Sequence, residues 1–537
     1  MGKRYLLDCT LRDGGYVNDW QFGHDNIVNI FERVVSSGID YIETGFLDDR
    51  RHFDINRSIF PDTDSAEKIY GRLEKRNTEV LAMIDYGTCE LSNLKPCEES
   101  FIDGIRVIFK KENLLPAMEF CKTIKSMGYK VFSQLVSITS YSDEELLEVT
   151  KIANEIGPYA LSIVDTYGLL NPAELTHIMG ILDGNLDKKI ILGFHAHNNF
   201  QLGYVNTTTA LDYDTDRDIL VDGTLYGMGK SAGNAPLELV AMYMNEKFGT
   251  NYIITEIQEA ITTSIMDFQK RSPWGYQLFY YIAASNRVHP NYVSYLMNKR
   301  TLSVTAVNEI LQRIPENKKL EKDMKLIEKL YIDYQSNECD DTSDTERLTS
   351  ELKGKKVLIM GPGSSVTRCT GDIMDYIKRE YPVIISINYI PEICRPDYMF
   401  VTNTTRFVQS ASKLHETSSA GVRLIASSNL TRTEREFDFV INYSGYIDEK
   451  AEFPDNSMCM LIRLLQRCGC SEAALAGLDG YTADSVNYFD TDKEYEFLKD
   501  KAESLNEYAR GFFAGIKDRI KITFVTPSEY QNENKSI

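Results

Sequence analysis

The stretch LDCTLRDGGY, residues 7–16, combines an apolar run with charged residues where the run ends. Apolar residues lead up to Cys9, and Arg12 and Asp13 then stand side by side in front of two glycines. Charged side chains are rarely buried at the end of such a run unless they are paired or have a function. The stretch therefore predicts a buried strand whose C-terminal end carries chemistry.

Seven more apolar runs of this kind follow before residue 226. Together the eight runs are YLLDCT (5–10), DYIETGF (40–46), EVLAMIDY (79–86), GIRVIF (104–109), KVFSQLVS (130–137), ALSIVDT (160–166), ILGFHAHN (191–198) and ILVDGTL (219–225). Between them, segments such as 24–38, 114–128 and 142–157 place apolar residues three and four positions apart and often end at glycine, which is typical of helices. Eight evenly spaced strand-then-helix units predict a closed (β/α)8 TIM barrel rather than a doubly wound open sheet, the structural alternative.

The composition of the 537-residue chain is that of an ordinary globular protein, and its charge argues against some partners. A net charge of -20 disfavours nucleic-acid binding and attachment to anionic lipid. The chain has no run of about 18 apolar residues, so no membrane span is expected, and its start does not resemble a signal peptide. The ten cysteines are scattered and predict free thiols in a reducing cytoplasm, with disulfides as the alternative.

Polar residues gather at the C-terminal ends of the predicted strands, the face on which TIM barrels carry their active sites. His195 and His197 stand two apart in GFHAHNN, so strand alternation points both imidazoles the same way. With Asp13 they could form one face of an octahedral divalent metal site that leaves positions for water or a chelating substrate. The alternative is a pair of structural histidines, and the turn GMGKSAGN (227–234) has a plain tight turn as its alternative.

Three motifs in this order give the chain a family resemblance. D-x-T-L-R-D-G at the start, H-x-H-N on a late strand and a glycine turn ending in G-N resemble the metal-dependent HMG-CoA lyase-like superfamily. Within it, AHNNFQLGYVNT (196–207) and GNAPLELV (233–240) are most similar to the 4-hydroxy-2-oxovalerate aldolases. The resemblance covers roughly residues 4–300 and implies a cytoplasmic carbon–carbon lyase, with a homodimer expected because such barrels commonly dimerise.

The resemblance implies how the matching positions would work together. Asp13, His195 and His197 would bind a divalent metal, with Mn²⁺, Mg²⁺ and Zn²⁺ all compatible. A 2-oxo acid such as pyruvate chelates such an ion through its carboxylate and ketone oxygens, and Arg12 would stabilise the enolate formed when the C–C bond breaks. The substrates would be a 2-oxo acid and an aldehyde. A structural ion pair is the alternative role for Arg12.

Three further positions match the family with less specific roles. Glu43 would support the arginine, and a core ion pair is an equally good interpretation. Thr166, in VDTYG, stands where the aldolases have a serine that contacts the substrate carboxylate. Asn234 matches a residue near the metal in some lyases.

The chain departs from the aldolases at the expected general base. They place a histidine three residues after the aspartate of the first motif, and Tyr16 stands there instead. A phenol with an unperturbed pKa of about 10 is a poor base at neutral pH. Three explanations remain open: a Tyr16 activated by the metal or Arg12, His24 at the start of the first helix, or a metal-bound water. The water and Tyr16 are favoured over His24.

Beyond the predicted barrel domain of residues 1–250, residues 251–334 are expected to form a helical extension. Its aromatic stretch SPWGYQLFYYIAASNRVHPNYV (272–293) has packing as the simplest interpretation. The aldolases, however, carry a tyrosine on a helical extension over the barrel mouth. By that resemblance Tyr276 is a candidate catalytic residue, whereas His289 is a weaker one.

A polar, acidic stretch over residues 335–353 predicts a linker to a second α/β domain over residues 354–537. The strand and glycine turn in KKVLIMGPGSSV (355–366) weakly resemble Rossmann-like domains of the pterin pyrophosphokinase-like and bacterial sialyltransferase-like kind. Backbone amides around Gly361, Gly363, Ser364 and Ser365 could hold the phosphate of a nucleotide or sugar nucleotide, and a tight turn is the alternative. The dinucleotide fingerprint is incomplete, because Val366 replaces its third glycine.

Three functions are weighed. The favoured one is a divalent-metal-dependent aldolase or lyase acting through the enolate of a 2-oxo acid. An acyl-CoA-dependent Claisen condensing enzyme is the second, although such enzymes usually continue TLRDGEQ where this chain has TLRDGGY. The third is an inactive barrel that serves as a scaffold for a nucleotide-binding C-terminal domain, and the complete Arg-Asp and H-x-H motifs argue against it.

Overall fold

The computed structural model describes residues 2–299, 302, 304–335, 339–414, 421–430, 437–448, 451, 453–482 and 501–531. The chain divides into two compact units. The first comprises Met1–Pro290 with Lys319–Glu321, and the second Asn291–Lys318 with Lys322–Ile537.

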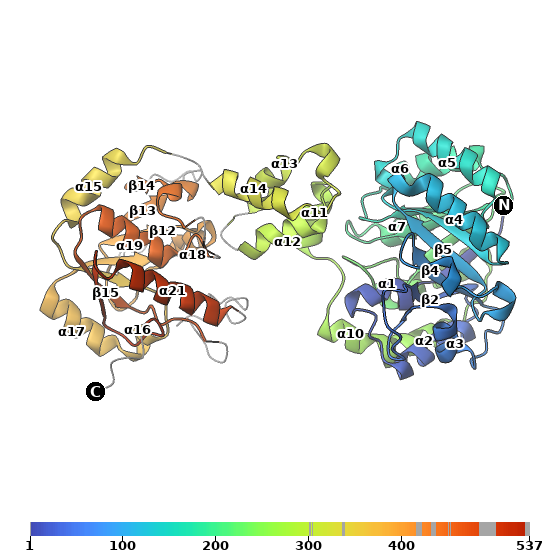
Figure 1. Ribbon diagram of the computed structural model, residues 1–537, viewed down its shortest axis with the longest axis horizontal. Coiled ribbons are helices and arrows are strands. Elements are labelled where there is room, and N and C mark those ends of the chain that lie inside the picture. The colour runs from blue at the N-terminus through green and yellow to red at the C-terminus, as the bar shows by residue number, and fades with distance from the viewer. Residues whose placement is uncertain are drawn as a thin grey trace. The chain divides into compact units, whose positions relative to one another are not determined.

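The first unit contains a closed barrel of eight parallel strands (Figure 1). They are β1 (Arg4–Asp8), β2 (Tyr41–Leu47), β4 (Glu79–Asp85), β5 (Gly104–Phe109), β6 (Lys130–Leu135), β7 (Ala160–Asp165), β8 (Ile191–Ala196) and β9 (Ile219–Gly223). Neighbours along the chain pair around the barrel, and β1 pairs with both β9 and β2, which closes it. The two-residue β3 (Ile59–Phe60) is added to β2. All eight predicted strands and the predicted closure are confirmed.

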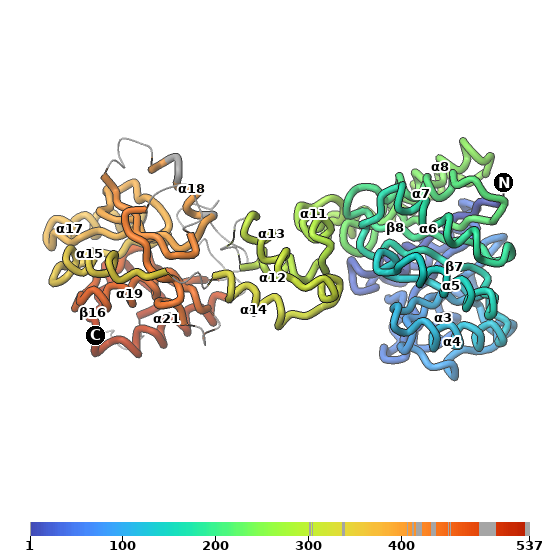
Figure 2. The backbone as a smooth tube through the Cα atoms, turned by 90° about the horizontal axis from the view of Figure 1, so that it is seen from above, coloured from blue at the N-terminus to red at the C-terminus, as the bar shows by residue number. Residues whose placement is uncertain are grey.

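Helices cover the outside of the barrel, and Figure 2 traces α4 to α7 in the same part of the molecule as β7 and β8. They are α2 (His24–Ser36), α3 (Thr63–Tyr70), α4 (Leu114–Ser126), α5 (Asp143–Ile156), α6 (Pro172–Asn185), α7 (Gly203–Asp212) and α8 (Leu237–Phe248). Their ends follow local chemistry: Ser142 and Asn171 each cap a helix through a capping box with a glutamate three residues on. The main apolar core lies between these helices and the strands.

The barrel interior separates an apolar floor from a polar mouth. A cluster including Leu7, Tyr41, Leu81, Phe132 and Leu220 fills the inside. Leu7 is the next-to-last residue of β1, and the other four come from the first half or middle of their strands, so inward positions nearer the C-terminal ends are free to carry polar groups.

The region after α8 is helical, as predicted for residues 251–334. It contains α9 (Ile254–Ala260), a π-helical turn (Ile261–Ile265), α10 (Met266–Arg271), α11 (Leu278–Ser285), α12 (Pro290–Lys299), α13 (Val304–Gln312) and α14 (Met324–Gln335). The prediction of a linker over residues 335–353 was wrong for most of this stretch, which forms helix α15 (Thr342–Leu352). Leu348 and Leu352, four residues apart, both enter the core of the second domain and hold this polar helix in place.

The second unit contains a seven-stranded parallel sheet in the order β14-β13-β12-β11-β10-β15-β16. The strands are β10 (Val357–Met360), β11 (Val383–Ile387), β12 (Tyr398–Val401), β13 (Arg423–Ser427), β14 (Phe439–Ile441), β15 (Glu472–Ala476) and β16 (Lys521–Phe524). Its helices are α16 (Ser365–Arg368), α17 (Thr370–Glu380), α18 (Thr404–Leu414), α19 (Ser457–Arg467) and α21 (Ala502–Ile516). Separate apolar clusters join α15, α19 and α21 to one set of strand residues and α16 and α17 to the alternate set, so helices cover both faces.

Short elements complete the description. They are α1 (Thr10–Asp13) and the 3-10 turns Gly14–Val17, Leu91–Asn93, Cys97–Glu99, Lys111–Asn113, Ile138–Ser140, Leu225–Gly227, Glu316–Lys318, Ser428–Leu430 and Tyr443–Gly445. All ten cysteines lie in the described part of the chain as free thiols, as predicted. Of the described helices, none has the length and apolar character needed to cross a membrane.

Candidate metal and active site

The three predicted metal ligands meet at the polar end of the barrel. Asp13 ends α1, directly after β1, while His195 lies in β8 and His197 follows its end. The three side chains are buried, and one ligand atom from each lies within 4.8 Å of the others. The strand register explains the meeting, because β1 and β8 both pair with β9 and so lie on either side of it.

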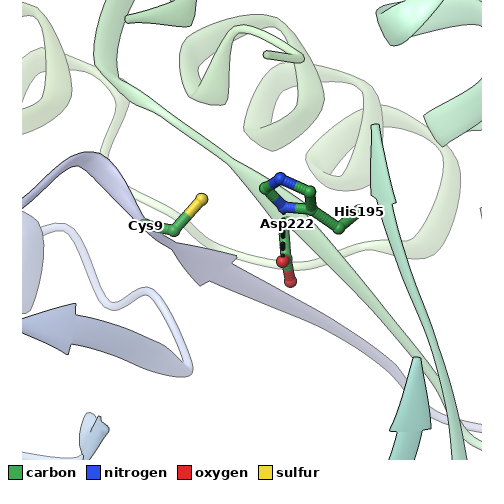
Figure 3. A group of neighbouring side chains, drawn as sticks. All are labelled: Cys9, His195 and Asp222. Atoms are coloured by element: carbon green, nitrogen blue, oxygen red, sulfur yellow. Dashed lines mark hydrogen bonds and ion pairs between the residues drawn. The ribbon is translucent and has the colours of Figure 1, made fainter. Parts of the chain in front are cut away.

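Asp222, on β9, fixes the orientation of the first histidine (Figure 3). The Nδ1 atom of His195 lies 2.8 Å from its carboxylate, which leaves the other ring nitrogen for a metal. In His197 the Nδ1 atom is buried and has no hydrogen-bond partner among the described residues. A buried nitrogen without a hydrogen-bond partner is unusual. Together with the neighbouring carboxylate and the second imidazole, it forms a set of donors of the kind that binds a divalent metal.

The protonation states of these groups also suit a cation. Burial alone would raise the pKa of the Asp13 carboxyl, but Arg12 and the two histidines hold it well below its usual range. Burial lowers the pKa of His197 to about 3. At neutral pH the aspartate is therefore ionised and this imidazole neutral, which are the forms that bind metals.

A second grouping, of Cys9, His195 and Asp222, lies beside the first, and Figure 3 shows its three side chains. It fits a metal less well. The Asp222 carboxylate already accepts hydrogen bonds from His195 and from Arg106. Burial raises the pKa of the Cys9 thiol well above its usual range, so the thiol stays protonated and is a poor ligand.

Arg12 is held between two carboxylates. Its Nε donates to Glu43 at 2.7 Å and its Nη1 to Asp13 at 2.7 Å. The same oxygen of Glu43 also accepts from Arg106 at 3.1 Å. The second Glu43 oxygen is buried and has no hydrogen-bond partner in the described part of the chain. Glu43 thus joins two guanidinium groups and orients the arginine next to the metal ligands.

Arg106 and Asp222 are the functional positions that sequence reasoning missed. Both stand inside apolar runs that were taken only as strands, GIRVIF and ILVDGTL. Arg106 is 1 % exposed and binds Glu43, Gln134 and Asp222. The signal that could have found them is an ionised residue within an otherwise apolar strand, because such a charge needs a buried partner.

The glycine turn after β9 is shaped around Asp13. Asn234 donates from its Nδ2 to this carboxylate and, at 3.2 Å, to the carbonyl of Met228. A Cβ at Gly229 would lie 2.1 Å from that Nδ2 and 2.7 Å from the Asp13 carboxylate. Glycine is therefore required here by close approach, and Asn234 lies near the predicted metal ligands.

Thr166, the predicted substrate-carboxylate contact, lies just past the end of β7. Its hydroxyl oxygen accepts the backbone N–H of Ser137 at 2.7 Å, and the side chain is partly exposed. Ser137 has a left-handed backbone with φ 53°. The hydroxyl itself donates to the carbonyl of Val164 at 3.5 Å, a long bond that a carboxylate could replace.

A cavity of about 250 Å³ lies at the mouth of the barrel. The rings of Tyr16, Trp274 and Tyr280 and the ammonium of Lys230 line it. Tyr276, the tyrosine expected there, is 59 % exposed and is not among the lining residues. The chain brings Tyr280 to the cavity instead, and its position on α11 could not be distinguished from four neighbouring aromatic residues in the sequence.

The two candidate bases differ in their surroundings. Tyr16 packs edge-on against Trp20 with ring centroids 4.9 Å apart. Burial raises the pKa of Tyr16 to about 12, an effect that Arg12 opposes only in part. His24 begins α2 and lies 3.7 Å from Asp25. At neutral pH the Tyr16 phenol therefore carries its proton, which argues against an activated Tyr16 as the base and leaves the phenol available as a hydrogen-bond donor.

The glycine turn of the second domain already binds a carboxylate, that of Asp479, at the position where a phosphate was expected. Asp479 accepts the backbone N–H of Ser365 at 2.7 Å and the hydroxyl of Ser364 at 3.3 Å. A Cβ at Gly363 would lie 2.6 Å from that carboxylate, and one at Gly361 would lie 2.4 Å from a backbone oxygen. The glycines therefore permit close packing of the turn, and a phosphate at this helix terminus would have to displace Asp479.

Comparisons with known proteins match the part of the chain that contains the barrel. The HMGL-like family model matches residues 3–266, so the barrel is an HMGL-like domain. A relative named 4-hydroxy-2-oxovalerate aldolase 2, from Salinispora arenicola, is 29% identical over 274 residues, which cover 50% of this chain and 77% of the relative. Oxaloacetate decarboxylase from Mycobacterium tuberculosis is 26% identical over 275 residues, covering 50% and 78%. The solved N-terminal domain of a candidate aldolase from Bacteroides vulgatus is 25% identical, with 56% of this chain and 98% of that one covered and a TM-score of 0.47.

Proposed function

We propose that this chain, whose residues 3–266 form an HMGL-like domain, is a divalent-metal-dependent lyase that makes or breaks a carbon–carbon bond through the enolate of a 2-oxo acid such as pyruvate. The observation that carries the proposal is the buried group of Asp13, His195 and His197 with Arg12 bonded to its aspartate. The two named relatives support it, because an aldol cleavage and the decarboxylation of oxaloacetate both generate the enolate of pyruvate.

When bound, the divalent ion supplies a Lewis acid that polarises the ketone and carboxylate oxygens of the 2-oxo acid. The side chains of the chain itself perform the remaining work. Arg12 uses its Nε and Nη1 on Glu43 and Asp13, which leaves Nη2 to donate to the developing enolate oxygen. In this proposal the Thr166 hydroxyl donates to the substrate carboxylate in place of its 3.5 Å bond to the carbonyl of Val164.

In the cleavage direction the bond between C3 and C4 of a 4-hydroxy-2-oxo acid breaks. The C4 hydroxyl loses its proton and becomes the aldehyde, while the bonding electrons pass through C3 and C2 to the ketone oxygen. Protonation of the enolate at C3 then gives the methyl group of pyruvate. Because that last step is reversible, exchange of the methyl protons with solvent reports enolate formation without any aldehyde.

The first expected result concerns the metal. The purified protein should exchange the methyl protons of pyruvate in deuterated water, and a chelator should abolish the exchange until Mn²⁺, Mg²⁺ or Zn²⁺ is added back. NMR follows the methyl signal, and elemental analysis gives the metal content. Undiminished exchange in the metal-free protein would contradict the proposal. A protein that neither retains metal nor exchanges would favour the scaffold alternative.

The second expected result concerns the proton. Replacing Tyr16 by phenylalanine should lower the exchange rate by about tenfold, the size expected for the loss of one hydrogen bond to a charged group. His24→Ala should change the rate by less than about twofold, because its ring lies against Asp25 at the surface. If His24→Ala abolishes exchange with the metal still bound while Tyr16→Phe remains near normal, His24 is the base.

A further inference from the structure

Lys230 has an environment that enolate formation does not explain. It stands in the turn after β9, next to Gly229, and its side chain is only partly exposed. Its Nζ lies 5.5 Å from the centroid of the Tyr16 ring. It lines the 250 Å³ cavity together with Trp274 and Tyr280. This cavity opens beside the metal ligands, on the side where Tyr16 replaces the histidine of the related aldolases.

The charge of Lys230 is not matched by the protein. Among the described residues, Arg12 is paired with Asp13 and Glu43, whereas Lys230 makes neither an ion pair nor a hydrogen bond. Asp13 and Asp85 attract it only through space. Its ammonium is partly exposed and faces the Tyr16 ring without a carboxylate partner among the described residues, so it is free to bind an anion that arrives with the substrate.

The metal would strengthen this demand for an anion. A divalent cation at Asp13 would neutralise the nearest carboxylate and add positive charge to the mouth. The carboxylate of the 2-oxo acid is used in chelation, so it does not satisfy Lys230 at the same time. The aromatic walls of the cavity suit the carbon chain of the second substrate, with the ammonium placed for a charged group on that chain.

We propose that Lys230 binds an anionic group, a carboxylate or a phosphate, on the aldehyde that joins or leaves the 2-oxo acid. The enzyme is thereby selective for negatively charged aldehydes. This inference rests on the proposed function. Lys230 is a specificity residue in this scheme, because it contacts a part of the aldehyde that does not react.

Aldol condensation with matched aldehydes tests the selectivity. Succinic semialdehyde is compared with butanal, and glyceraldehyde 3-phosphate with glyceraldehyde, so that the pairs separate carboxylate from phosphate recognition. In the wild type, kcat/KM should be about 10- to 100-fold higher for the anionic member of at least one pair, the range for a hydrogen bond to a charged group. Lys230→Met should reduce this ratio to about one through a raised KM for the aldehyde, and Lys230→Arg should retain most of it.

A matched control separates a specific contact from general charge. Lys110 follows β5 at the same end of the barrel and acts on Asp85 through space, as Lys230 does. Lys110→Met should leave the ratio of kcat/KM values within about twofold of the wild type. If the ratio of kcat/KM values falls equally in Lys110→Met and Lys230→Met, the proposed contact between Lys230 and the aldehyde is wrong. An unchanged ratio in Lys230→Met would also contradict it.

Binding without turnover gives a second measurement. The chain has two tryptophans, and Trp274 lines the cavity while Trp20 packs on Tyr16, so tryptophan fluorescence reports this region. Succinate or glycerol 3-phosphate should quench it in the wild type but not in Lys230→Met, and glycerol should quench neither. If Lys230→Met instead raises the KM for pyruvate in the deuterium-exchange assay, the lysine serves the 2-oxo acid and the inference is wrong. Absence of pyruvate exchange in the wild type would instead contradict the proposed function itself.

Discussion

Replacing His197 by alanine is expected to remove the metal and to lower the rate of pyruvate deuterium exchange by at least about 10³-fold, the loss expected when several kcal/mol of Lewis-acid stabilisation disappear. Its Nδ1 is buried and has no hydrogen-bond partner among the described residues, so the substitution breaks no hydrogen bond at this atom. Asp13 and His195 would remain as only two of the three ligand groups.

Elemental analysis and the exchange assay on the same preparation provide the measurement. His177→Ala is the matched control, because His177 lies on α6 at the surface and contacts Asp143, outside the group of metal-ligand candidates. It should keep full metal content and full exchange. A His197→Ala protein with normal metal content and normal exchange would show that the two histidines are structural, which was the alternative for the H-x-H motif.

Arg12→Met is expected to retain the metal but to lower the exchange rate by about 10²- to 10³-fold, the usual cost of removing one donor to a developing oxyanion. The loss should appear in kcat, because the Nη2 donor strengthens its bond as charge builds on the ketone oxygen. Arg12→Lys should recover part of the rate, since an ammonium supplies charge without the fixed fork of the guanidinium.

Arg12→Met also leaves Glu43 with one cation fewer, so stability must be measured beside activity. A buried carboxylate that loses a partner destabilises the fold, and urea unfolding would detect this. Arg33→Met is the control, because Arg33, on α2, forms a partly exposed ion pair with Glu256 on α9. If Arg12→Met exchanges pyruvate normally while folded and metal-loaded, Arg12 is a structural residue and the enolate is stabilised elsewhere.

Much of the barrel and part of its site could be predicted from the sequence. Strands and helices follow from local periodicity, and the eight strand positions needed no knowledge of distant residues. The H-x-H pair could be predicted for the same reason, because alternation along a strand fixes which side chains share a face. Asp13 followed from its place at the end of the first strand.

The second domain was less predictable. Its strands β13, β14 and β16 were missed. Helix α15 was taken for a linker because all of its 11 residues except two leucines are polar. Leu348 and Leu352 face the core at helical spacing, and their significance depends on a sheet built from residues later in the chain. A short amphipathic helix of low hydrophobicity is stabilised mainly by such packing.

The sequence by itself determined the barrel, the buried metal-ligand candidates and the arginine beside them, since each depends on spacing within one strand and its end. Only the tertiary structure decided the pairings: Arg106 with Glu43 and Asp222, Asp222 with His195, and Tyr280 rather than Tyr276 at the cavity. It also left Lys230 without a described carboxylate partner. The physical reason is that closing the barrel brings together strands that lie up to about two hundred residues apart, and the energy of a buried charge is set by the groups that arrive beside it and not by its neighbours in the chain.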